Sequence, residues 1–180
     1  MNWIPNVLGF QIVWMASVGG AAQGWWWLGP AALAVFAAMQ LALSRQRRAD
    51  LILMLGSAAL GFLVDSAWVV AGWMEFRAAL PWPGAAPIWI VAMWMGFALT
   101  LNHSLGALKN RPVLAALLGL VGGPLAYWAA ARAWDAVTIV PSPWPYVALG
   151  LAWAVLTPAL LRAAQILTGE SRTAAMASQA

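Results

Sequence analysis

Six long apolar stretches, separated by short links, dominate the pattern of hydrophobic and polar positions along the chain. They cover residues 4–23, 27–44, 51–73, 88–108, 113–136 and 146–167. An α-helix needs about 20 apolar residues to cross the roughly 30 Å of hydrocarbon in a bilayer. These stretches are apolar on every side, whereas the strands of a membrane β-barrel alternate apolar and polar residues. The pattern therefore predicts an all-α, polytopic membrane protein in which residues 1–167 form one bundle of six transmembrane helices.

Most of the positively charged residues follow the second and fourth stretches or close the sixth, and these three places fall on one side of such a bundle. They are Arg45, Arg47, Arg48, Lys109, Arg111, Arg162 and Arg172. The links on the opposite side are rich in Trp and carry nearly balanced charge. Cytoplasmic loops are enriched in Lys and Arg, and Trp is enriched at membrane interfaces. We therefore expect both termini in the cytoplasm, a flexible cytoplasmic tail over residues 168–180, and a multi-pass protein of a bacterial inner membrane.

The composition agrees with this class, because 64% of the residues are hydrophobic and only 8% are charged. A soluble domain of this length could not bury so many apolar side chains. The net charge of +4 arises at the ends of the stretches, which indicates topology and contact with anionic lipids, and we expect no nucleic-acid binding. One histidine and no cysteine cannot supply a three-ligand zinc site or a bis-histidine haem site, so neither a metal nor a cofactor is expected.

Two ionisable residues lie well inside the apolar stretches, namely His103 and Asp65. Ionisable groups at membrane depth are rare and usually face the interior of a bundle or a water-filled cavity. We therefore take His103, Asn102 and Asp65 as candidate catalytic residues. The structural alternative for His103 and its neighbours is hydrogen bonding between helices. For Asp65 the alternative is a buried neutral acid that donates one hydrogen bond across the bundle.

Further polar and aromatic residues in the stretches are candidates for substrate binding. They are Asn6, Gln11, Trp14, Thr100, Ser104 and Tyr127. Counted at about 1.5 Å per helical residue, most of the polar ones fall in a layer near the cytoplasmic side, together with His103. Tyr127 falls in a deeper layer with Asp65. Because the two layers are more than about 10 Å apart, we expect no direct ion pair between His103 and Asp65, and we expect Tyr127 or Ser17 to be the partner of Asp65.

Several motifs carry a resemblance to a known family. They are Asn6-x-x-Gly9-Phe10-Gln11-x-x-Trp14, Asp65-Ser66, Pro87-x-Trp89-Ile90, Thr100-Leu101-Asn102-His103-Ser104-Leu105 and Gly122-Gly123-Pro124-Leu125-Ala126-Tyr127. Their order and spacing resemble a family of small bacterial inner-membrane proteins catalogued as domain of unknown function 2878. That family has no established activity. Its members often lie near genes for lipid-modifying enzymes such as cyclopropane-fatty-acid-synthase-like methyltransferases, so the resemblance implies membrane-lipid metabolism and a lipid-modifying enzyme as partner.

Three kinds of function fit these observations. A membrane-lipid-linked enzyme or enzyme subunit, in which His103 transfers a proton, predicts a polar pocket open to the cytoplasmic leaflet. A transporter or flippase for a small solute or lipid predicts a continuous polar route across the membrane. A membrane scaffold for a partner enzyme predicts that Asp65 and His103 are satisfied inside a closed bundle. We favour the first function, with membrane lipids as partners and with a homo-oligomer as a further expectation for a chain of this size.

Overall fold

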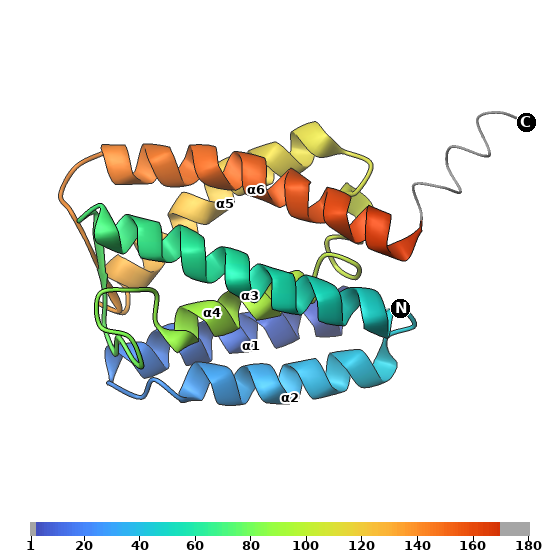
Figure 1. Ribbon diagram of the computed structural model, residues 1–180, viewed down its shortest axis with the longest axis horizontal. Coiled ribbons are helices and arrows are strands. Elements are labelled where there is room, and N and C mark those ends of the chain that lie inside the picture. The colour runs from blue at the N-terminus through green and yellow to red at the C-terminus, as the bar shows by residue number, and fades with distance from the viewer. Residues whose placement is uncertain (1–2, 170–180) are drawn as a thin grey trace, which may run out of the picture.

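The computed structural model describes residues 3–169, which form six helices running side by side (Figure 1). These helices are α1 (Trp3–Ala22), α2 (Leu28–Leu43), α3 (Arg47–Val70), α4 (Ile88–Ala98), α5 (Pro112–Arg132) and α6 (Trp144–Thr168). Except for α4, each begins and ends within four residues of the range predicted from the sequence. The expected tail, residues 168–180, lies outside the described residues beyond Gly169.

Four of the helices, α1, α3, α5 and α6, are long and apolar enough to cross a membrane. Their length and composition are those of a membrane protein. The helices α2 and α4 are shorter, with 16 and 11 residues. At a rise of about 1.5 Å per residue, α4 covers only about 16 Å, roughly half of the hydrocarbon core.

The fourth predicted helix is the largest error of the sequence-based analysis, because α4 ends at Ala98 and not at residue 108. Polar side chains bind the carbonyl groups at its end. The Thr100 hydroxyl donates to the carbonyl oxygen of Phe97 at 2.6 Å, and the Asn6 amide donates to that of Leu99 at 3.0 Å. Such side-chain bonds compete with the helix for backbone partners. The chain then continues through tight turns and a short 3₁₀ helix, η1 (Gly106–Leu108), to the start of α5.

The short helix α4 lies in the centre of the bundle. It packs against α3 on one side and against α1 and α2 on another, while α5 packs along α6. Trp89, Ile90 and Trp94 of α4 are almost completely buried. Gly61 of α3 allows this close approach, since a Cβ atom added there would lie 2.1 Å from Cγ of Trp94. The packing therefore presents the polar segment that follows α4 to several helices at once.

The all-α prediction is confirmed, and a small two-stranded sheet lies at one end of the bundle. The strands β1 (Met74–Phe76) and β2 (Val137–Ile139) pair antiparallel, with Glu75 opposite Thr138. An ion pair between Arg77 and Asp135 links the same two connections of the chain. The sheet joins the α3–α4 and α5–α6 connections at what we call the sheet end of the bundle.

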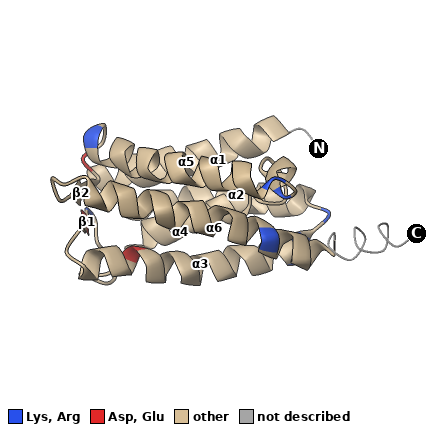
Figure 2. Cartoon of the chain, turned by 90° about the horizontal axis from the view of Figure 1, so that it is seen from above, with Lys and Arg blue, Asp and Glu red and all other residues tan. Residues whose placement is uncertain are grey.

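The opposite end, which we call the basic end, is where α1 begins and α6 ends (Figure 1). It also holds the α2–α3 and α4–α5 connections, with Arg45, Arg47, Arg48, Lys109 and Arg111. Charged residues gather at the two ends of the bundle and leave its middle largely uncharged (Figure 2). This distribution is typical of a bundle whose middle lies in hydrocarbon.

Candidate functional site

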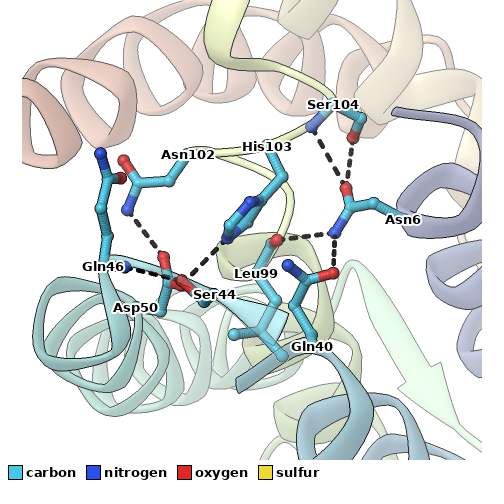
Figure 3. Close-up of polar contacts among 9 residues, drawn as sticks. All are labelled: Asn6, Gln40, Ser44, Gln46, Asp50, Leu99, Asn102, His103 and Ser104. Carbon is cyan, nitrogen blue, oxygen red and sulfur yellow. Dashed lines mark hydrogen bonds and ion pairs between the residues drawn. The ribbon is translucent and has the colours of Figure 1, made fainter. Parts of the chain in front are cut away.

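A buried carboxylate organises the polar residues at the basic end. Asp50, in the first turn of α3, is fully buried. Its Oδ2 accepts a hydrogen bond from the Ser44 hydroxyl at 2.5 Å and lies 3.0 Å from Nε2 of His103, and its Oδ1 accepts from the Asn102 amide at 2.8 Å (Figure 3). The His103 side chain is 7% exposed. Two of the three candidate catalytic residues are therefore held by one acid that the sequence-based analysis did not select.

Asp50 was missed because the third span was predicted to begin at residue 51. That boundary placed Asp50 in a solvated link among Arg45, Arg47 and Arg48. The helix starts earlier, at Arg47, so its first turn carries the acid into the bundle. A usable signal existed, since acidic residues are enriched in the first turn of helices.

Asn6 of α1 is the centre of a second set of hydrogen bonds at the same end. Its amide donates to Oε1 of Gln40 at 2.9 Å and to the Leu99 carbonyl at 3.0 Å. Its own oxygen accepts from the hydroxyl of Ser104 at 2.6 Å and from the Ser104 backbone N–H at 3.3 Å. Asn6 therefore fastens α1 and α2 to the irregular segment that follows α4.

The two sets lie on opposite sides of this segment, residues 99–105. Asn102 and His103 point toward α3, and Ser104 points toward α1 (Figure 3). Hydrogen bonds to charged groups and between buried side chains hold such a segment in one conformation. These side-chain hydrogen bonds therefore hold the segment in place where the sequence predicted that helical hydrogen bonds would continue.

Asp65 belongs to a separate buried site in the last third of α3. It accepts hydrogen bonds from the indole N–H of Trp94, at 2.6 Å, and from the hydroxyl of Tyr127. The prediction of Tyr127 as a partner is confirmed, whereas Ser17 packs against Gly29 of α2 instead. The structure also pairs His103 with Asp50 and not with Asp65, as the predicted difference in depth requires.

A cavity of about 490 Å³ lies between α1 and α5 and is also lined by residues of α4 and α6. We call it the groove. Its wall is mainly apolar and includes several aromatic side chains and glycines, namely Phe10, Trp14, Trp94, Phe97, Trp153, Gly119, Gly122 and Gly123. Leu118 and Leu125 of α5 line it and are also exposed on the outside of the bundle. The groove therefore opens through the side of the bundle, between its two ends.

The groove separates the predicted site residues into two groups. Five of the six candidates for substrate binding line it, namely Gln11, Trp14, Thr100, Ser104 and Tyr127. Asn6 lies behind it, bonded to Ser104. His103, Asn102 and Asp65 are not part of its lining. The structure thus brings together the residues predicted to bind a substrate, and it places the candidate catalytic residues behind them.

The aromatic side chains of the groove wall pack against one another. Trp94 stacks on Trp153 with ring centroids 4.7 Å apart, and Phe97 meets Trp153 edge-on at 5.5 Å. Both groups that donate to Asp65, Trp94 and Tyr127, line the groove. Asp65 therefore orients two side chains of the wall without reaching the cavity itself.

No set of three His, Asp or Glu side chains within residues 3–169 is placed to hold a metal ion. The chemistry available at the groove is accordingly that of hydroxyl groups, an amide and aromatic rings. Such a lining binds apolar molecules that carry a few neutral polar atoms.

The resemblance noted in the sequence is confirmed by the comparison with protein families. The model of a family described as protein of unknown function (DUF2878) matches residues 3–159. No curated protein and no solved structure matches the chain. The family match includes all five helices from α1 to α5 and most of α6. The chain therefore belongs to the DUF2878 family.

Proposed function

We propose that this protein is a lipid-binding subunit of membrane-lipid metabolism that takes a membrane lipid sideways into the groove. The observation that carries the proposal is the groove between α1 and α5, with its apolar wall and its polar residues Gln11, Thr100 and Ser104. Its volume of about 490 Å³ lies within the roughly 300–1,000 Å³ typical of ligand sites. A lipid can enter from the bilayer without crossing water.

The proposal includes a topology in which all six helices cross the membrane. The short helix α4 reaches the basic end only through residues 99–111. The side chains of Thr100, Asn102, His103 and Ser104 in this segment are hydrogen-bonded inside the protein, as irregular backbone at membrane depth requires. The excess of Lys and Arg at the basic end supports a cytoplasmic location for that end. The polar residues of the groove then belong to the cytoplasmic leaflet of a bacterial inner membrane.

The position of His103 favours a lipid-binding subunit over an enzyme that uses this histidine as its base. A general base must come within hydrogen-bonding reach of the proton that it removes. His103 faces Asp50 on the far side of residues 99–105 from Ser104, which lines the groove (Figure 3). Chemistry on the bound lipid would then be supplied by the partner enzyme.

The two other functions receive less support. Along α3, the carboxylates of Asp50 and Asp65 are about 22 Å apart at the helical rise. The groove is lined by neither of them and its wall is mainly apolar, which does not favour a polar transport route. The scaffold function is favoured by one observation, since Asp65 and His103 are both hydrogen-bonded inside the bundle. A scaffold has no need of a groove, so lipid binding in the groove separates the two proposals.

Photo-crosslinking in membranes tests the proposal. A diazirine placed in the acyl chain of a bilayer lipid should label peptides of α1 and α5 that line the groove. Gly122 lines the groove and an added Cβ meets nothing within 4 Å, so Gly122→Phe should fill the cavity and abolish this labelling. Gly56 of α3 is equally unobstructed and lies outside the groove, so Gly56→Phe is the matched control and should label like the wild type.

Labelling of the groove peptides that survives in Gly122→Phe would reject the lipid-binding proposal. In cells, deletion of the gene should change one lipid class, and only protein with an open groove should restore it. A deletion strain with an unchanged lipid composition would favour the scaffold.

A further inference from the structure

The polar side chains of the groove are all uncharged. They are Gln11, Thr100, Ser104, Tyr127 and Thr157, and no Asp, Glu, Lys, Arg or His lines the cavity. A charged group placed against this lining would lose its hydration without gaining a partner of opposite charge. The part of a lipid that enters the groove must therefore be neutral.

Three of the hydroxyl groups already use their protons inside the protein. Ser104 donates to Asn6, Thr100 donates to the Phe97 carbonyl, and Tyr127 donates to Asp65. Each hydroxyl has one proton to donate. These three side chains therefore cannot serve as donors to a ligand while they keep their present partners.

Gln11 is the lining residue that still has accessible free N–H groups, and it is exposed. Gln11 forms no side-chain hydrogen bond with the part of the chain that the structure describes. The indole N–H of Trp153 also has no acceptor among the described residues, but this atom is fully buried and is not exposed to the cavity. Gln11 lies about 12 Å along α1 from its first residue, at a depth where hydrocarbon offers an amide no hydrogen bond. The groove therefore offers the free N–H groups of one amide to a ligand that carries a neutral acceptor.

From these observations we infer that the groove binds an ester-linked acyl chain, whose carbonyl oxygen accepts a hydrogen bond from the Gln11 carboxamide. The inference rests on the proposed function and adds the chemical class of the lipid. An ester carbonyl is neutral, accepts but does not donate, and is attached to a chain that fits an aromatic wall. Both phospholipids and neutral acylglycerols carry this group.

Binding of matched ester and ether lipids tests the inference. Full-length protein in detergent micelles is titrated with diacylglycerol and phosphatidylethanolamine, each in an ester-linked form and in an ether-linked form that lacks the carbonyl. Native mass spectrometry gives the apparent Kd of each lipid. Because one neutral hydrogen bond changes affinity by about two- to tenfold, the ester form of at least one lipid should bind several-fold more tightly than its ether form. The preferred lipid then identifies the source of the ester.

Variants assign this preference to Gln11. Gln11→Leu should weaken ester binding by about the same factor and leave ether binding unchanged. Gln23 lies at the other end of α1, outside the groove, and donates to the Gly19 carbonyl, so Gln23→Leu is the matched control and should retain the preference. The comparison of ester with ether on the wild-type protein needs no variant to fold.

The outcomes separate the two proposals. Equal binding of ester and ether forms, or an ester preference that persists in Gln11→Leu, overturns the inference about the carbonyl. If Gly122→Phe still abolishes binding in that case, the lipid-binding function stands without it. If Gly122→Phe changes the binding of no lipid, the groove is not the binding site and both proposals fail.

Discussion

At the scale of single residues, Asp50 has the largest structural role that the structure indicates. Asp50→Ala leaves the Asn102 amide and Nε2 of His103 without their partner in a buried place. Since a buried polar group without a partner costs about 1–3 kcal/mol, we expect the free energy of unfolding to fall by at least about 2 kcal/mol. Thermal unfolding of purified protein in detergent measures the loss.

The control for Asp50 is Ser57 of α3, which is also buried but whose hydroxyl has no partner among the described residues. Ser57→Ala should leave the unfolding temperature nearly unchanged, because no hydrogen bond is lost. An Asp50→Ala protein as stable as Ser57→Ala would show that the network does not hold residues 99–105.

Asp65 and Tyr127 should act as a unit, because the Tyr127 hydroxyl donates to the buried carboxylate. In a double-mutant cycle with Asp65→Ala and Tyr127→Phe, the single changes should each lower stability. The double variant should lose less than their sum, by about 0.5–3 kcal/mol, as expected for residues in one hydrogen bond. Unfolding free energies that add within about 0.5 kcal/mol would contradict the pairing.

At the scale of elements, two neighbouring glycines of α5 face different surroundings. A Cβ at Gly123 would lie 2.4 Å from Cδ1 of Trp153, whereas one at Gly122 meets nothing within 4 Å. Gly123→Ala should therefore force α5 away from α6 and lower stability by about 1–3 kcal/mol. Gly122→Ala should be neutral or stabilising by up to about 1 kcal/mol, since alanine favours the helix. Chemical unfolding of both variants tests this, and equal stabilities would contradict the close packing at Gly123.

The sequence predicted elements well where one physical term dominates. Five helices follow from apolar length alone, because hydrocarbon demands about 20 apolar residues per span. The end of α4 at Ala98 depends on Asn6, whose amide donates to the carbonyl oxygen of Leu99, 93 positions later in the chain. Such a tertiary contact leaves no local pattern. The partner of His103 was missed for a related reason, since Asp50 is recognisable as buried only when the start of α3 is known.

The groove belongs to the packing of the helices and could not be read from the sequence. The expected depth of polar residues in the membrane selected Gln11, Thr100, Ser104 and Tyr127. All four line the groove. Depth alone could not tell on which side of a segment a side chain lies. His103 and Ser104 are neighbours in the chain, yet one faces α3 and the other the groove.

At the scale of the whole molecule, the proposed six crossings make a prediction for each of the five connections between helices. The chain has no cysteine, so one introduced cysteine is the only thiol that a membrane-impermeant maleimide can label. Trp25→Cys, Trp82→Cys and Thr138→Cys, at the sheet end, should react in intact spheroplasts. Arg45→Cys and Arg111→Cys, at the basic end, should react only after the membrane is permeabilised, because positively charged links stay in the cytoplasm.

The shorter helices are the decisive ones in this experiment, since α2 and α4 have 16 and 11 residues. If positions 25 and 45 react from the same side, α2 does not cross, and if positions 82 and 111 do so, α4 does not cross. In the second case, the polar residues after α4 would lie at the same membrane surface as the sheet. The network around Asp50 would then not be needed to supply hydrogen bonds to polar groups surrounded by hydrocarbon. The labelling of Arg111→Cys therefore decides whether that network serves a membrane-embedded segment.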